Sequence, residues 1–448
     1  MNALFKKWVS KKKTRFVVLL LVVCVVIVIV GVGIVLILMN KHSGMKHNYG
    51  FSGHGLPIIS IDLNGVTLEE IDSGLKDTKY YNNSLELYNS GKLLVNDNVE
   101  IKGRGNGTWW GQEKKPYRIK FNRKINLLGL GKGKKWYLIS NALDDTFLRN
   151  DTAFYIEEML GMNYILRGDY IELYVNGDYR GLYYLTPAVA IGKNGVDLRD
   201  DLGILVELDN YYGGLEENYT TLDGEMLVIK DLVSKDKKKE AINDFLETFN
   251  KFEESINGGD YERIENLVDI DSFARYFLLS EFIVNPDAYL TSFYFYKDGI
   301  SDKIHVGPGW DFDIAFGNRR WVNWMGDKFY SPKEKMVRAQ EIKMIESGLI
   351  EGIEGQFGNS KSQSRIIFKL MEYPQFRQRV EEIFKDKMLG KREELMRMMN
   401  NRAVSIYYSA TIDGEKWNKL NYEEELKKMM KWIWQRYDYF EEEYGFDK

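Results

Sequence analysis

The feature that most constrains this chain is an uncharged run from Phe16 to Met39, made mainly of Val, Leu and Ile. At about 1.5 Å per helical residue, a run of this length spans the roughly 30 Å hydrocarbon core of a bilayer. Six basic residues precede it between Lys6 and Arg15, whereas only Lys41 and Lys46 follow closely. Because cytoplasmic flanks carry the excess of positive charge, we expect the N-terminus inside the cell and the rest of the chain outside.

A cleaved signal peptide is the alternative to a membrane anchor. The run is longer than the roughly 7–15 residues of a signal h-region, and no clear Ala-x-Ala cleavage site follows it. The sequence therefore predicts a basic cytoplasmic segment over 1–15, a transmembrane helix over 16–39, a juxtamembrane linker over 40–56 and an exterior domain over 57–448. The expected protein is a single-pass membrane protein whose main domain is extracytoplasmic.

Composition excludes several kinds of catalytic site. Cys24 is the single cysteine and lies in the apolar run, so neither an internal disulfide nor a cysteine zinc site can form. Three of the four histidines fall between His42 and His54, which argues against a histidine-centred triad. No P-loop or nucleophile-elbow motif is present. The 62 basic and 66 acidic residues nearly balance, so no nucleic-acid partner is expected.

Hydropathy patterns divide the exterior domain at about residue 235 and predict an α+β fold. Before this point, apolar and polar residues alternate with the period of half-buried strands, and Asn176-Gly177 is a hairpin signal. After it, apolar residues recur at helical spacing. Predicted strands are Pro57–Leu63, Tyr117–Phe121, Asp169–Val175, Asp178–Leu185, Gly203–Asp209, Tyr294–Lys297 and Lys303–Val306. Predicted helices are Asp151–Leu160, Lys237–Ile256, Asp271–Ile283, Ser364–Met371, Pro374–Met399 and Tyr422–Tyr444, and 319–358 is an insertion without an assignable pattern.

Two carboxylates, Asp311 and Asp313, stand two residues apart between a Gly-Pro-Gly turn and a Gly-Asn turn, just after a predicted strand pair. Such a pair suits a hard cation such as Mg²⁺, which proteins usually hold with one or two carboxylates plus substrate phosphates. The alternative is a pair of carboxylates that cap turns. Glu207 and Asp209 share a polar strand face, for which a solvent-exposed edge is favoured over a position facing a cleft.

Other polar groups fit the binding of phosphates. The glycine-rich segment that contains Arg104 and Asn106 can present backbone amides and a guanidinium to phosphates, although it also reads as a tight turn. Lys120 and Arg118 share the polar face of their strand, where solvated side chains are the alternative. Asp287 follows Asn-Pro, a context that is also typical of a turn at the end of a helix.

Several segments in order resemble the CotH kinase family, atypical protein-kinase-like proteins named for a spore-coat component. Any one of them is weak, but five or more in the right order form a fairly specific signal that covers about residues 100 to 440. The segments are Ile101–Trp109, Lys114–Phe121, Trp136–Asp145, Leu173–Tyr183, Gly309–Asn318, Leu370–Arg377 and Trp432–Arg436.

The resemblance implies a divergent bilobal kinase fold that binds ATP with Mg²⁺ or Mn²⁺ and phosphorylates a hydroxyl of a protein. It makes Asp311 the metal-binding aspartate, Asp313 a further ligand and Asp287 the catalytic aspartate. The kinase pattern has an Asn five positions after the catalytic Asp to hold a second metal. This chain has Ser292 there, and no His-Arg precedes Asp287.

Two functions remain open at this stage. The first is an anchored CotH-like kinase in which Lys120 and Arg104 clamp phosphates. The second is a catalytically silent surface module that organises a coat, or binds an envelope polymer or protein. Ser292 favours the silent module, whereas retention of both carboxylate elements favours the kinase. A kinase outside the cytoplasm needs an enclosed compartment, such as a forming spore, to supply its ATP.

Overall fold

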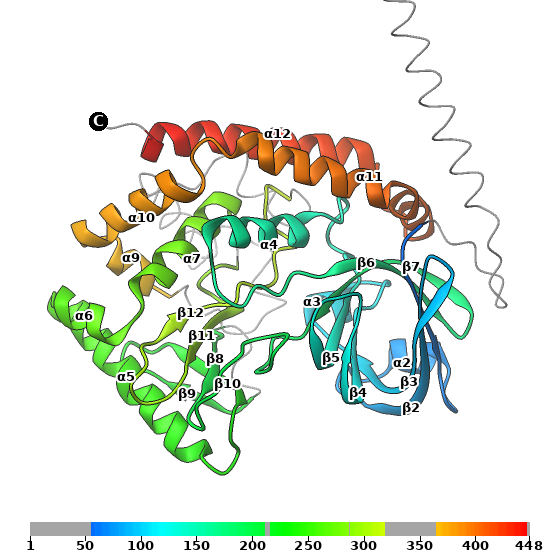
Figure 1. Cartoon of the computed structure of the whole chain (residues 1–448), viewed down its shortest axis with the longest axis horizontal. Coiled ribbons are helices and arrows are strands. Elements are labelled where there is room, and N and C mark those ends of the chain that lie inside the picture. Colours follow the sequence, from blue (N-terminus) through cyan, green and yellow to red (C-terminus); the bar gives the residue numbers. More distant parts are fainter. Residues whose placement is uncertain (1–54, 211–215, 286, 319–363, 446–448) are drawn as a thin grey trace, which may run out of the picture.

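The computed structural model describes residues 55–210, 216–285, 287–318 and 364–445. These residues form a mixed α+β fold, as the sequence predicts (Figure 1). The predicted transmembrane helix over 16–39 and the 319–358 insertion lie outside the described residues. Among the helices that are described, none is long and apolar enough to cross a membrane.

Seven of the described strands close into a barrel in the order β1-β2-β3-β4-β5-β7-β6. Inward side chains such as Ile101, Ile119 and Trp136 are fully buried in its core, and β1 closes the ring by pairing in parallel with β6. Two short helices, α2 (Leu68–Ser73) and α3 (Gly107–Gly111), accompany the barrel. The strands are β1 (Ile58–Asp62), β2 (Tyr80–Asn89), β3 (Lys92–Gly103), β4 (Tyr117–Asn126), β5 (Lys132–Ile139), β6 (Asp169–Val175) and β7 (Asp178–Pro187).

A second sheet has the order β12-β11-β8-β10-β9, and β8 lies at its centre. The expectation of a solvent-exposed edge at Glu207 and Asp209 is wrong, because these residues are only 5% and 8% exposed. Strand β8 pairs with β11 on one side and β10 on the other, so it is a central strand of the sheet and not an edge. The strands are β8 (Ile204–Leu208), β9 (Asn218–Thr220), β10 (Met226–Leu232), β11 (Phe293–Lys297) and β12 (His305–Val306).

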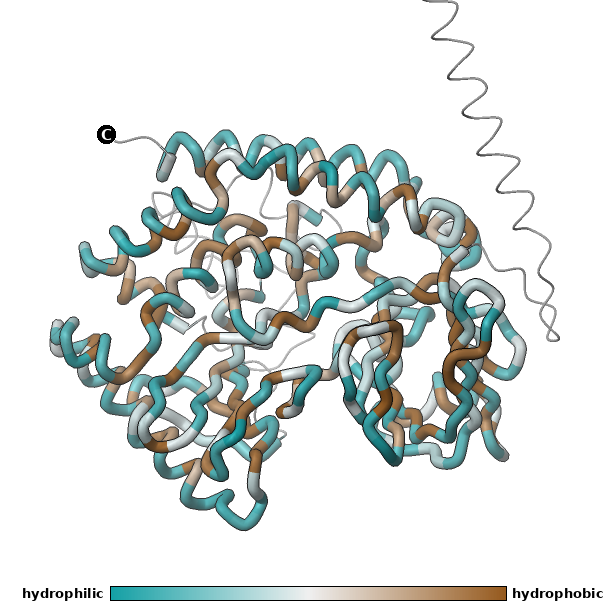
Figure 2. Tube along the Cα trace, viewed as in Figure 1, coloured by the Kyte–Doolittle hydropathy of each residue, from teal (hydrophilic) through white to brown (hydrophobic). Residues whose placement is uncertain are grey.

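Helices surround this sheet, and α7 is buried along most of its length. Figure 2 shows α7 as largely hydrophobic and the outer helix α12 as largely hydrophilic. The prediction of one helix over 374–399 is wrong, because the chain breaks near Gly390 at φ +73° and resumes as α11. The helices are α4 (Arg149–Leu160), α5 (Lys238–Gly258), α6 (Tyr261–Leu267), α7 (Ile270–Ile283), α9 (Ile366–Leu370), α10 (Pro374–Lys387), α11 (Arg392–Lys416) and α12 (Tyr422–Phe440), and a π-helical turn follows at η3 (Glu441–Gly445).

Candidate active site

The segment after β12 that carries Asp311 and Asp313 is fixed by contacts on both sides. The amide of Phe312 donates to Asn150 Oδ1 at 3.0 Å, and the amide of Phe316 donates to the carbonyl of Ile283 at 2.7 Å. Asp311 itself adopts the left-handed conformation at φ +65°, which is uncommon for a residue with a side chain. Contacts with the start of α4 and the end of α7 therefore fix the backbone conformation of the segment that carries the two carboxylates.

A second set of contacts ties this segment to the loop before α4. Asn318 Nδ2 donates at 2.8 Å to the carbonyls of both Leu143 and Asp313. Arg149, which is ion-paired with the buried Asp144, donates from Nε to the carbonyl of Ala315 at 2.9 Å. The motif that ends at Asp145 thus packs against the motif that starts at Gly309. Sequence reasoning did not assign this supporting role, since the polar residues before α4 follow no spacing rule.

Burial and neighbouring charges shift the ionisation of three carboxylates in this region. Burial, followed by the negative charges of Asp311 and Asp209, raises the pKa of Asp287 to about 7. Burial also raises the pKa of Asp311, and the nearby Arg104 guanidinium opposes this rise. Burial raises the pKa of Asp313 well above its usual range, and Asp311, Asp144 and Asp287 add to the effect. The structure therefore brings the predicted catalytic and metal-binding aspartates into one electrostatic unit that a bound cation would neutralise.

The donor set fits a cation that arrives with phosphates. Within the described ranges, no three carboxylate, thiol or imidazole groups converge closely enough to form a protein-only metal cage. Asp311 and Asp313 can supply two carboxylates, and Mg²⁺ takes its remaining ligands from water and phosphate oxygens. The same oxygen donors suit Mn²⁺. The residues present are thus compatible with Mg²⁺ or Mn²⁺ bound together with a nucleotide.

Arg104 connects the glycine-rich loop to this unit. Its guanidinium carbon lies 4.7 Å from the ring centre of Tyr137 and 5.5 Å from that of Trp310, the neighbour of Asp311. Gly105 follows at φ +75°, where a Cβ would come within 2.2 Å of the Thr108 hydroxyl. The loop between β3 and β4 therefore needs glycine to place Arg104 over the carboxylate segment.

Asn106 uses its amide oxygen inside the protein. Lys76 Nζ donates to Asn106 Oδ1 at 2.6 Å. Burial lowers the pKa of Lys76, the charges of Lys102 and Arg104 lower it further, and Asp77 and Glu216 oppose the shift. Lys76 lies between α2 and β2 and contacts the glycine-rich loop through Asn106. Sequence reasoning missed it, because a lone lysine after a short helix carries no signal.

Arg118 and Lys120 point away from the barrel core on β4. Arg118 is ion-paired with Glu100, while Lys120 lies opposite Glu100 on β3 and Lys135 on β5. Lys135 in turn lies 4.0 Å from Asp231 of the second sheet. Arg118 and Lys120 therefore line the face of the barrel that meets this sheet. Neither side chain affects the pKa of Asp287, Asp311 or Asp313, as Arg104 does for two of them.

Ser292 lies at the start of β11 with its backbone at φ +53°. Its amide donates to Glu207 Oε1 at 3.0 Å, and Glu207 Oε2 is 2.9 Å from Lys230 Nζ. Burial raises the pKa of Glu207, and the Lys230 charge opposes this rise. Sequence reasoning singled out Ser292 and Glu207 but missed Lys230.

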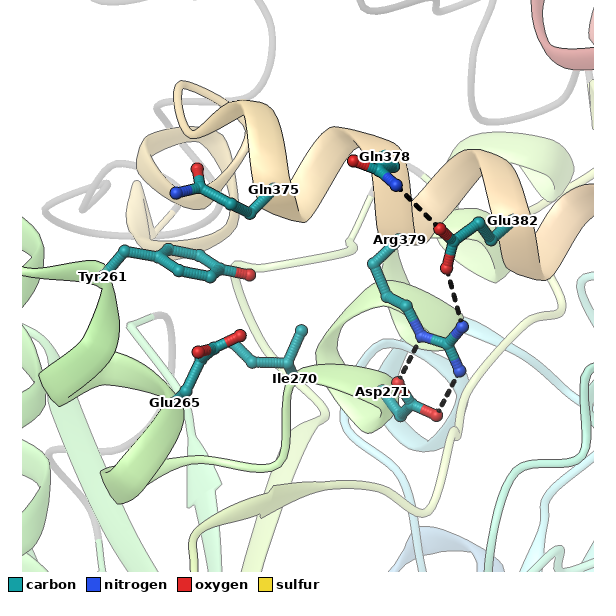
Figure 3. Close-up of a pocket in the computed structure, with 8 residues that line it drawn as sticks. All are labelled: Tyr261, Glu265, Ile270, Asp271, Gln375, Gln378, Arg379 and Glu382. Carbon is teal, nitrogen blue, oxygen red and sulfur yellow. Dashed lines mark hydrogen bonds and ion pairs between the residues drawn. The ribbon is translucent and has the colours of Figure 1, made fainter.

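A separate pocket of about 370 Å³ lies between α6, α7 and α10 (Figure 3). Its Arg379 donates to both carboxylate oxygens of Asp271 at 2.6 and 2.8 Å, and to Glu382 at 2.9 Å. These charges are satisfied by one another. The pocket shares no residue with the carboxylate unit, so it is not the candidate active site.

Comparisons with known proteins bear on this geometry. The family described as CotH kinase protein matches residues 99–440. No curated protein matches the chain. Among solved structures, the crystal structure of a Helicobacter pylori proinflammatory kinase, CtkA, is 11% identical, covering 66% of this chain and 94% of that chain with a TM-score of 0.23. With so low a TM-score, this likeness carries no argument about fold or function.

The matched range contains the glycine-rich loop, both carboxylate elements and the helices that hold them. It also covers well over half of the sequence. The chain therefore belongs to the CotH kinase family.

Proposed function

We propose that the chain is a membrane-anchored kinase that transfers the γ-phosphoryl group of ATP to a hydroxyl of a protein substrate. The observation that carries the proposal is the position of Arg104, whose guanidinium lies over the ring of Trp310, beside the carboxylates of Asp287, Asp311 and Asp313. Family membership supports the general activity. In this proposal the nucleotide lies where the barrel meets the second sheet, as in a two-lobed kinase.

Each group has a distinct task in the proposed reaction. Asp311 and Asp313 hold the cation, which when bound neutralises charge on the phosphates. Arg104 and the amides of the glycine-rich loop contact phosphate oxygens, and Lys120 adds positive charge from the barrel face. The acceptor oxygen forms a bond to the γ-phosphorus, the bond to the β–γ bridging oxygen breaks with its electrons leaving on ADP, and Asp287 takes the hydroxyl proton. Burial and the charges of Asp311 and Asp209 raise the pKa of Asp287 in the absence of a cation, and a bound cation would favour the ionised carboxylate that can accept this proton.

The proposed location rests on sequence. The apolar run over 16–39 and its basic flank support an N-terminus in the cytoplasm and a kinase domain outside the membrane. An enclosed compartment such as a forming spore would supply ATP. The substrate would then be a coat or envelope protein at the bacterial cell surface.

Calorimetry on the full chain in detergent micelles tests the proposal. We expect saturable ATP binding that requires Mg²⁺ or Mn²⁺ and is lost in Asp311→Ala. Asp178→Ala, at an exposed position that begins β7, is the matched control and should bind like wild type. Absence of binding by the wild type with either cation would favour the silent surface module, the reading that Ser292 supports.

A further inference from the structure

Ser292 occupies the place at which the kinase pattern has an Asn that holds a second cation. Its hydroxyl is a shorter and weaker ligand than an amide oxygen. Its backbone amide is engaged by Glu207, because the nitrogen donates to Oε1 at 3.0 Å. The chain therefore departs from the two-cation pattern at Ser292, and the backbone of this residue is hydrogen-bonded to β8 of the second sheet.

A positive charge lies next to this departure. Lys230 Nζ is 2.9 Å from Glu207 Oε2, so a single carboxylate bridges the Ser292 amide and the Lys230 ammonium. The register of β10 against β8 shifts between Ile229 and Asp231, which places Lys230 at the irregularity. Such a bulge re-aims a side chain that a regular strand would direct elsewhere.

Glu207 joins Lys230 to the segment that follows Asp287, because it accepts from the amide of Ser292, five residues after Asp287. Tyr294 stands opposite Glu207 in the β8–β11 register. Burial raises the pKa of Tyr294 well above its usual range, and the charges of Glu207, Tyr137 and Asp311 add to the shift. One buried phenol thus lies within electrostatic reach of Glu207, of the cation-binding Asp311 and of the ring beneath Arg104.

We propose that Lys230 is a further residue of the phosphoryl-transfer site and that its ammonium takes the place of the second divalent cation, so that this chain binds ATP with one Mg²⁺ or Mn²⁺. The inference rests on the proposed function. In it, the charge of Lys230 replaces the charge of the second cation, which Ser292 would bind only weakly. A lysine can serve as a point charge for phosphates. Lys230 is partly exposed, and its other partner, Glu216, is a largely exposed carboxylate that phosphate oxygens can replace at little cost. Glu207 keeps the ammonium in position during this exchange.

The test counts cations and measures ATP affinity in the full chain in detergent. Electron paramagnetic resonance of free Mn²⁺ gives the number bound at saturating ATP, and we expect one per wild-type chain. In Lys230→Met the ATP affinity should fall about tenfold to a hundredfold. Lys230→Arg should stay close to wild type, and Lys235→Met, an exposed lysine three residues after β10, is the matched control.

A second pair of variants makes the test specific. Combining Lys230→Met with Ser292→Asn should restore much of the affinity and raise the Mn²⁺ count to two. The Asn side chain supplies the missing ligand, and removal of the ammonium removes the positive charge that would repel a second ion. Lys230→Met also leaves Glu207 buried without its cation, so Glu207→Gln combined with Lys230→Met serves if the single variant fails to fold.

Two outcomes overturn the inference while the proposed function stands: two Mn²⁺ ions in wild type, or unchanged ATP affinity in a folded Lys230→Met. If wild type binds no ATP with either cation, the proposed function fails first and the role of Lys230 fails with it.

Discussion

Gly309 and Glu157 fit against each other without room for another atom. A Cβ at position 309 would lie 1.7 Å from Glu157 Oε1, and the Glu157 side chain is fully buried on α4. Since Gly309 stands two residues before Asp311, this contact couples the position of α4 to the carboxylate segment. A shift of α4 would therefore displace the segment that carries Asp311 at the proposed cation site.

Gly309→Ala should therefore impair both stability and cation-dependent binding. Overpacking of this kind typically costs about 1–3 kcal/mol, because the buried Glu157 and the Phe312 ring would both have to shift. Thermal unfolding and ATP titration measure the two effects. Gly258→Ala in α5, where a Cβ meets nothing within 4 Å, is the control and should be neutral or slightly stabilising. Equal behaviour of the two variants would contradict the coupling.

The pKa of Asp287 predicts a pH dependence of stability in the absence of cation. The pKa is about 7 in the folded protein against 3.8 ordinarily, so the folded state binds the proton more tightly. This contribution to stability is fully present below about pH 4 and is lost as the pH rises to about 7, by at most about 4 kcal/mol. Unfolding measured across this window in a chelator should show the loss.

Two comparisons isolate this effect. Asp287→Asn should flatten this part of the pH profile, and Asp178→Asn should leave it unchanged. Mg²⁺ with ATP should also reduce the slope, since a cation favours the ionised carboxylates. A profile that is the same in wild type and Asp287→Asn would show that Asp287 does not titrate in this range.

The hydrogen bond between Lys76 and Asn106 should stabilise the glycine-rich loop in its binding shape. Lys76→Met and Asn106→Ala should each weaken ATP binding, and the double variant should lose less than the sum of the two. The coupling energy should be about 0.5–1.5 kcal/mol, the usual net contribution of one hydrogen bond. Lys79→Met, an exposed lysine nearby, is the control. Strict additivity in the cycle would rule out the coupling.

A buried ion pair joins the barrel to α11. Lys114 Nζ bonds to Asp413, both side chains are almost fully buried, and the Leu182 amide also donates to Asp413 at 2.8 Å. Lys114→Met leaves the carboxylate buried without a cation and should cost about 3–5 kcal/mol. Combining it with Asp413→Leu should recover part of the loss in chemical denaturation. A single variant as stable as wild type would contradict this role.

Local signals in the sequence predicted local structure. The hairpin between β6 and β7 is confirmed, with Asn176 and Gly177 both at positive φ as a type I′ turn requires. The break near Gly390 was missed because one glycine costs a helix only about 1 kcal/mol and does not by itself end it. Whether it ends the helix is decided by the packing of α10 and α11.

The sequence pattern could not predict which strands pair with one another across long distances in the chain. Alternation predicts a half-buried strand but does not name its neighbours, so neither the β1–β6 pairing that closes the barrel nor the central place of β8 could be foreseen. The aspartates of the site stood out because composition left few other reactive groups. Lys76 and Lys230 did not, because each acquires a partner only through the fold.

Barrel closure also limits how this protein can associate with others. A closed barrel offers no free strand edge, and the described second sheet ends in the short strands β9 and β12, of three and two residues. Exposed long edges are the usual route to strand-by-strand polymerisation. The described part of the chain therefore offers no long free edge to which a neighbouring strand could add.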